Sequence, residues 1–236
     1  MSTVHGSTDV DLSIGGFVPF STTDYPGRLA AVVFCQGCPW RCRYCHNPHL
    51  QRPYAPHEWT WPRVRGWLDR RRGLIDAVVF SGGEPTAQSA LEPALACART
   101  LGFDIGLHTA GMYPRRLARL LHRVHWVGLD IKAPVNAYRH VTGIDGSGTP
   151  AFECLDLLLA SDVAFEVRTT VHPELTSPRA LRALARALAD RGVRRWTLQR
   201  FRAQGCSDAS LAQDDAYVVP DLVASLAAHV PEIATR

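Results

Sequence analysis

The feature of this sequence that most constrains its fold is a series of short apolar runs, each about as long as a β-strand. These runs are rich in β-branched residues and alternate with segments of helical period. The six runs lie at residues 29–34, 75–80, 103–108, 126–131, 164–171 and 195–201. Such alternation predicts right-handed crossovers and a mostly parallel sheet. Six units are too few for a closed eight-stranded barrel, so we predict an α/β fold built as an open or partial barrel.

The length of the chain bounds its domain organisation. A chain of 236 residues suits one large domain better than two ordinary domains and a linker. We therefore expect residues 1–236 to form a single domain, with residues 1–14 as an N-terminal arm. Residues 203–236 should form a C-terminal extension with a helix near residues 220–229. One helix should begin after Ser177 as N-cap and end at Gly192.

Composition and charge exclude several classes of protein. The longest apolar runs fall far short of the roughly 20 residues that a membrane helix needs, so we expect no membrane association. The N-terminus lacks the basic start and apolar core of a secretory signal, which favours the cytoplasm. The small excess of 26 Lys and Arg over 22 Asp and Glu lies mostly at residues 63–73 and 191–202. Because no aromatic stacking platform accompanies them, these runs indicate solvated faces and no nucleic-acid partner.

Four of the seven cysteines fall within eleven positions: Cys35, Cys38, Cys42 and Cys45. The reducing cytoplasm disfavours disulfides, so the cluster indicates a metal site. Zinc sites with four cysteines usually separate their two pairs by roughly 15–20 residues, whereas three residues separate them here. An ordinary ferredoxin run ends with C-x3-C-P, an order that this sequence lacks.

A third interpretation uses only Cys38, Cys42 and Cys45. Three thiolates would hold a four-iron cluster with one open iron, and an open iron can bind a substrate. Cys35 is then a small buried residue that needs no function. The three dispersed cysteines are interpreted as packing residues, and they are Cys97, Cys154 and Cys206.

The spacing C-x3-C-x2-C, with Tyr44 directly before the last cysteine, resembles the signature of the radical S-adenosylmethionine (SAM) enzymes. The resemblance implies a [4Fe-4S] cluster held by Cys38, Cys42 and Cys45, whose open iron chelates SAM. Reductive cleavage of SAM then gives methionine and a 5′-deoxyadenosyl radical. It also implies that Tyr44 packs near the adenine of SAM. The alternative for Tyr44 is a structural role in a small core of the cysteine loop.

Two further motifs follow predicted strands. In "SGGEP", glycines let the backbone approach a ligand closely. The resemblance implies that Gly82, Gly83 and Glu84 meet the amino group of SAM, although a plain strand-to-helix turn also explains the glycines. In "LDIKAP", Asp130 and Lys132 are two residues apart and share one face of the strand. The resemblance places this pair near SAM, and a structural ion pair is the alternative.

Two polar residues lie on apolar strands. Arg168 must find an anion or reach water, because an unpaired buried charge is costly. Related enzymes place a residue near the SAM carboxylate at this position. His108 and Ala110 stand where glycyl-radical-enzyme activases have the Asp and Asn of an Asp-Thr-Asn-Gly stretch. This difference puts in doubt a monovalent-cation site, and His108 is expected to neighbour the SAM site.

The motifs together span about residues 15–175 and look like the anaerobic ribonucleoside-triphosphate reductase activating proteins, a branch of the glycyl-radical-enzyme activases. The resemblance implies a partial (β/α)6 radical SAM barrel and an oxidoreductase that forms a glycyl radical on a partner enzyme. It also implies a flavodoxin or ferredoxin as electron donor. Two alternatives remain open: a radical SAM enzyme for a small molecule, such as a deazaguanine-forming type, and a non-catalytic iron-sulfur or zinc sensor.

Overall fold

The computed structural model describes residues 10–56, 58–214 and 217–236, and its strands join one eight-stranded sheet in chain order. The strands are β1 (Ile14–Ser21), β2 (Ala30–Cys35), β3 (Ala77–Gly82), β4 (Asp104–Thr109), β5 (Trp126–Asp130), β6 (Ala164–Val171), β7 (Arg195–Arg200) and β8 (Glu232–Thr235). β1 pairs with β2 in antiparallel direction, and every later neighbour pair is parallel. The predicted α/β fold with a mostly parallel sheet is confirmed.

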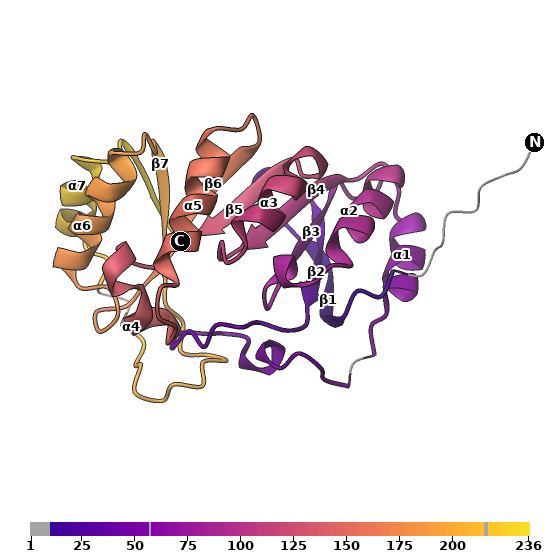
Figure 1. Cartoon of the computed structure of the whole chain (residues 1–236), viewed down its shortest axis with the longest axis horizontal. Helices are drawn as coiled ribbons and strands as arrows, with labels where there is room; N and C mark the ends of the chain where they lie inside the picture. Colours follow the sequence, from indigo (N-terminus) through magenta and orange to yellow (C-terminus); the bar gives the residue numbers. More distant parts are fainter. Residues whose placement is uncertain (1–9, 57, 215–216) are drawn as a thin grey trace, which may run out of the picture.

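Helices follow the parallel strands and cover one face of the curved sheet (Figure 1). They are α1 (Trp61–Asp69), α2 (Leu91–Thr100), α3 (Pro114–Leu120), α4 (Tyr138–Thr142), α5 (Gly148–Leu159), α6 (Pro178–Ala189) and α7 (Pro220–Ala227). Short 3-10 helices lie at Pro48–Gln51, Pro85–Ala87, Leu121–Arg123 and Val135–Ala137. In the described part of the chain, no helix is both long and apolar enough to span a membrane.

The predicted runs agree with β2 to β7 to within two residues at either end. α6 begins as expected, because the Ser177 hydroxyl accepts a hydrogen bond from the Ala180 amide at 3.3 Å. α7 also lies where a helix was expected. β1 and β8 were not predicted. Of the expected N-terminal arm, residues 1–9 lie outside the described residues, and Leu12 is already buried against the core.

Alternate residues of each strand face opposite sides of the sheet. On β2, Ala31 and Val33 pack against the helices, whereas Val32 packs on the inner face. There Tyr25 and Trp126 stack with ring centroids 5.3 Å apart and fill the space near the amino ends of the strands. The inner face is therefore closed at that end, and polar residues occupy it toward the carboxyl ends.

Candidate active site

A cavity of about 570 Å³ lies at the carboxyl ends of the parallel strands. Every predicted site residue except Glu84 lines it: Cys38, Cys42, Tyr44, Cys45, Gly82, Gly83, His108, Asp130, Lys132 and Arg168. Strand alternation explains much of this convergence, since inner-face residues of β4, β5 and β6 meet where these strands end. A volume of this size is typical of a small-molecule site.

The three predicted ligands lie on residues 36–47, here called the cluster loop, which leaves β2 without regular structure. The end of α4 supports the middle of this loop. The amides of Arg41 and Arg43 donate to the carbonyls of Thr142 and Val141, each at 3.0 Å. Within the loop, the Cys45 amide donates to the Cys42 carbonyl, also at 3.0 Å. Backbone contacts therefore place the three cysteines around the cavity.

Burial controls the chemistry of two of these thiols, those of Cys38 and Cys42. It raises the pKa of Cys38 to about 12 and also raises the pKa of Cys42, while Lys132 opposes the rise at both. Thiols in such surroundings stay protonated at neutral pH. A metal that binds there displaces the protons and stabilises the thiolates.

The donor set fits a cluster better than a single ion. Among residues 10–56, 58–214 and 217–236, no three potential ligands gather closely enough to hold one metal ion. A tetrahedral zinc site would bring its ligands to roughly 2.0–2.3 Å from one point. Three thiols spread around one cavity instead suit a larger inorganic group. His46, directly after Cys45, also has a buried Nε2 without a hydrogen-bond partner.

The glycine turn after β3 packs against the start of the cluster loop. Gly82 has a φ of 115°, and a Cβ there would lie 2.4 Å from the Cys35 amide nitrogen. A Cβ on Gly83 would lie 2.3 Å from the Gly37 carbonyl oxygen. The amides of Gly83 and Glu84 donate to the carbonyls of Cys35 and Gly37, each at 2.8 Å. Both glycines are therefore required by close backbone packing, and both also line the cavity.

Glu84 is fully buried and does not line the cavity. Its carboxylate accepts hydrogen bonds from the Thr109 hydroxyl at 2.7 Å and from the Ala110 amide at 2.9 Å. The amide and hydroxyl of Thr86 donate to it as well, at 3.1 and 2.5 Å. Burial raises the pKa of Glu84 despite these donors. Glu84 thus joins the ends of β3 and β4, and its direct contact with SAM stays a prediction.

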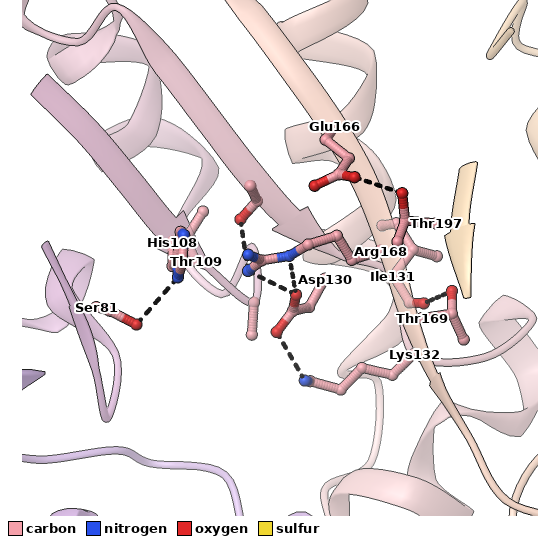
Figure 2. Close-up of polar contacts among 12 residues, drawn as sticks. Ser81, His108, Thr109, Asp130, Ile131, Lys132, Glu166, Arg168, Thr169 and Thr197 are labelled. Atoms are coloured by element: carbon pink, nitrogen blue, oxygen red, sulfur yellow. Dashed lines mark hydrogen bonds and ion pairs between the residues drawn. The ribbon is translucent and has the colours of Figure 1, made fainter. Parts of the chain in front are cut away.

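Asp130 lies between Arg168 and Lys132 at the ends of β5 and β6 (Figure 2). Arg168 directs Nε and Nη2 to one carboxylate oxygen at 2.9 Å, and Lys132 Nζ lies 3.5 Å from the other. Burial alone would raise the pKa of Asp130, but Arg168 and Lys132 outweigh it and lower that pKa. Gly128 leaves room for the guanidinium, because a Cβ there would lie 2.7 Å from Arg168 Cζ.

Lys132 also connects this charged group to the cluster loop. Its Nζ donates to the Tyr44 hydroxyl at 3.1 Å and lies 5.2 Å from the centre of the Tyr44 ring. Burial alone would lower the pKa of Lys132, but Tyr44 and Asp130 raise it well above its usual value. Lys132 is therefore a cation, and Tyr44 is buried beside it while still lining the cavity.

His108 has both ring nitrogens engaged on the inner face. Nε2 lies 2.8 Å from the Asp24 carbonyl, to which it donates, and Nδ1 lies 3.2 Å from the Ser81 hydroxyl. Burial, with a smaller contribution from Arg168, lowers the pKa of His108 to about 3. The imidazole is therefore neutral. His108 lines the cavity, and its position beside SAM stays a prediction.

The structure also separates the other cysteines from the cavity. Cys35 is fully buried on the helix side of the sheet, and its burial raises its pKa. Cys97 and Cys154 lie in α2 and α5. Cys206 lies outside the helices, and its thiol donates to the Arg43 carbonyl in the cluster loop at 3.2 Å.

Several lining residues were not predicted, among them Met112, Thr170, Gln199 and Arg236. Thr170 lies two residues beyond Arg168 on β6, so strand alternation places both on the same face. The sequence pattern could therefore have predicted Thr170 as a lining residue. Arg236 follows β8, a strand that the sequence pattern did not predict, so no signal pointed to it.

Known proteins share both the sequence pattern and the fold. The model of the radical SAM superfamily matches residues 32–188. A Methanocaldococcus jannaschii protein assigned as a glycyl-radical enzyme activating enzyme is 26% identical over 83% of this chain and 82% of its own length. The pyruvate formate-lyase-activating enzyme of Clostridium pasteurianum is 32% identical, over 77% of this chain and 79% of its own.

The fold agrees with a solved structure, that of Streptococcus suis SuiB bound to S-adenosylmethionine. The TM-score is 0.67 at 12% identity over 85% of this chain, which spans about half (48%) of SuiB. The chain belongs to the radical SAM superfamily and, within it, to the glycyl-radical-enzyme activating enzymes, which use a [4Fe-4S] cluster and SAM.

Proposed function

We propose that this chain activates anaerobic ribonucleoside-triphosphate reductase by forming a radical on one of its glycines. One observation carries the proposal: a single cavity is lined by the three thiols, by the glycine turn and by the charged side chains of Asp130, Lys132 and Arg168. The choice of partner rests on the motif stretches at residues 15–50, 78–88, 129–134 and 167–175, which resemble the activators of that reductase. We place the reaction in the cytoplasm, because a reducing compartment keeps cysteine thiols available to hold a cluster.

Cys38, Cys42 and Cys45 would hold the cluster, with three thiolates on three irons. When bound, the cluster and SAM would supply the radical chemistry that removes a hydrogen atom from the α-carbon of a glycine. The residues around them bind and orient. Arg168 and Lys132 present positive charge toward the SAM carboxylate, and the backbone of Gly82 and Gly83 approaches its amino group.

Charge in the cavity supports a protein substrate. Arg200 and Arg202 line it together with Lys132, at the side formed by β5 and β7. Basic residues at the mouth would steer an acidic surface of the partner toward the site. An extended loop that carries glycine could then enter at the carboxyl ends of the strands.

Reduction of the cluster needs an electron from outside the chain. The remaining cysteines do not form a second cluster motif in the sequence, so we do not propose electron transfer through another iron-sulfur site of this chain. We propose a reduced flavodoxin or ferredoxin as the one-electron donor.

The test is electron paramagnetic resonance of the reconstituted protein mixed with SAM, reductant and anaerobic ribonucleoside-triphosphate reductase. We expect a doublet, split by the α-hydrogen that remains on the glycyl radical. SAM cleavage driven by a small metabolite, without this doublet for any glycyl-radical enzyme, would instead support a small-molecule substrate.

A further inference from the structure

The cluster loop keeps its shape through contacts with other segments, among them the burial of Trp40 and the hydrogen bond between Tyr44 and Lys132. It contains no helix or strand, and its middle depends on two backbone hydrogen bonds to the end of α4. A three-ligand cluster requires its thiolates to stay in place during each cycle of reduction and SAM binding. Contacts from distant parts of the chain therefore matter for this loop.

One distant segment, residues 201–212, lies against the loop and is here called the strap (Figure 1). Asp208 of the strap accepts a hydrogen bond from Arg43 Nε at 2.8 Å, and the Ser210 hydroxyl accepts one from Arg43 Nη2 at 3.2 Å. Ser210 in turn fixes Asp208, since its amide and hydroxyl donate to the other carboxylate oxygen at 3.0 and 2.5 Å. Both oxygens of Asp208 are thereby engaged.

Three other residues of the strap also contact the loop. The Cys206 thiol donates to the Arg43 carbonyl at 3.2 Å. Gly205 has a φ of 83°, and a Cβ there would lie 2.7 Å from the His46 carbonyl oxygen. The ring of His46 stacks on Phe201 with a centroid distance of 5.6 Å and an interplanar angle of 25°.

The other side of the strap is anchored to β6 and the turn that follows it. His172 Nε2 donates to the Ala212 carbonyl at 2.8 Å, and the His172 ring meets Phe201 edge-on at 5.1 Å. Because the strap is fixed at both ends, it can transmit the rigidity of the sheet to a loop that lacks regular structure.

We propose that the strap is the positioning element of the cluster loop and that Asp208 acts through Arg43 to hold two cluster ligands in place. Arg43 lies between Cys42 and Cys45 in the sequence, so a fixed guanidinium restrains the backbone on which both thiols stand. The inference rests on the proposed role of these cysteines as ligands. Asp208 lies outside the cavity and acts only through the loop.

Two variants loosen this contact in different ways, and each has a matched control. Asp208→Asn removes the nearer of the two carboxylates that pair with Arg43, since Glu174 lies 3.9 Å away. Asp156→Asn removes a carboxylate from the pair with Arg191 on the helix side, at 3.1 Å. Gly205→Ala introduces a clash with the loop. Gly192→Ala has nearly the same φ, 87°, but nothing within 4 Å of its Cβ.

The first measurement uses the full-length protein without cluster and follows trypsin cleavage after Arg41 and Arg43 by mass spectrometry. The second follows release of iron from the reconstituted protein to a chelator. We expect Asp208→Asn and Gly205→Ala to accelerate both processes about 2- to 10-fold over the wild type, the range for one partly exposed charged contact. The controls should match the wild type.

The inference is overturned if both strap variants behave like Asp156→Asn and Gly192→Ala in cleavage and in iron release. Neither measurement involves a partner enzyme. Absence of a glycyl radical would therefore count against the proposed function and leave the role of the strap standing. Circular dichroism of each variant checks that the sheet is intact, because a global loss of structure would accelerate cleavage at sites outside the loop as well.

Discussion

Arg168 and Asp130 stand opposite each other on β6 and β5, and two guanidinium nitrogens reach the same carboxylate oxygen at 2.9 Å. Both Arg168 and Lys132 have side chains that are only 7% exposed. Asp130→Asn would leave these two cations without their shared anion. We expect the free energy of unfolding to fall by about 3 kcal/mol, at the low end for a broken buried ion pair because Asp130 is 31% exposed.

Urea denaturation of the protein without cluster measures this effect. Asp156→Asn, which removes an anion from an exposed pair, should change the free energy of unfolding by less than about 1 kcal/mol. Equal effects of the two substitutions would show that the Asp130 pair does not stabilise the fold.

A second prediction concerns pH and follows from the low pKa of His108, about 3 against roughly 6.5 in an unfolded chain. As the pH falls below 6.5, His108 takes up a proton in the unfolded chain but not in the folded protein. The stabilising contribution of neutral His108 is complete above pH 6.5 and is lost as the pH falls toward 3. The titration of His108 therefore changes the free energy of unfolding by at most about 1.4 kcal/mol per pH unit.

His108→Gln removes this titration while keeping a donor and an acceptor. The free energy of unfolding, measured by urea denaturation between pH 4 and 7, should therefore depend less steeply on pH in His108→Gln than in the wild type. His122→Gln, at an exposed position, should keep the wild-type slope. Parallel curves for His108→Gln and the wild type would mean that His108 takes up its proton at nearly the same pH in the folded protein as in the unfolded chain.

The strands illustrate what the sequence can predict. β2 to β7 were predictable because each is a largely buried apolar run and helical segments separate one run from the next. β1 was not predicted because Gly15, Gly16 and Pro19 interrupt its pattern and three of its eight residues are exposed, so only pairing with β2 defines it. β8 has four residues, mostly exposed, and depends on β7 in the same way. Local pattern carries little signal for strands that form at an edge.

The site shows the same limit. Spacing alone placed Asp130 and Lys132 on one face, and the structure puts both in the cavity wall. The environment of Glu84 depends on Thr109 and Ala110, 25 and 26 residues further along the chain, whose approach no local pattern encodes. Likewise, contact between Asp208 and Arg43 joins residues 165 positions apart. Such long-range polar contacts follow from the assembled fold.

A third prediction assigns the cluster ligands. Cys38→Ala, Cys42→Ala and Cys45→Ala should each lose the four-iron cluster, because three thiolates are the minimum for a cluster with one open iron. Cys35→Ala should keep it, since that thiol is buried on the helix side of the sheet. Iron and sulfide analysis after anaerobic reconstitution provides the measurement. A full complement of four irons in Cys42→Ala would refute the assignment.

A fourth prediction concerns SAM affinity. Arg168→Ala should assemble the cluster but bind SAM about 10- to 100-fold more weakly, as expected for one lost charge-assisted hydrogen bond. We expect Glu84→Ala to weaken binding to a similar extent, because its carboxylate orders the ends of β3 and β4. Equilibrium binding of labelled SAM to the reconstituted variants measures this loss of affinity. Wild-type affinity in both would rule out this placement of SAM.

The last prediction tests whether the position of Arg168, and not its charge alone, matters for SAM. A Cβ at Gly128 would lie 2.7 Å from the Arg168 guanidinium carbon, so Gly128→Ala should push that group away from Asp130. The Cβ would also lie 2.9 Å from the Trp126 ring, and the displaced guanidinium would lose its buried pair with Asp130, so the free energy of unfolding should fall as well, roughly as far as in Asp130→Asn. We expect SAM affinity to fall roughly as far as in Arg168→Ala. Gly16→Ala is the control, because its Cβ would make only ordinary contacts, at 3.7 Å from the nearest atom. If Gly128→Ala bound SAM as tightly as Gly16→Ala, the alignment of Arg168 with Asp130 would not contribute to SAM binding.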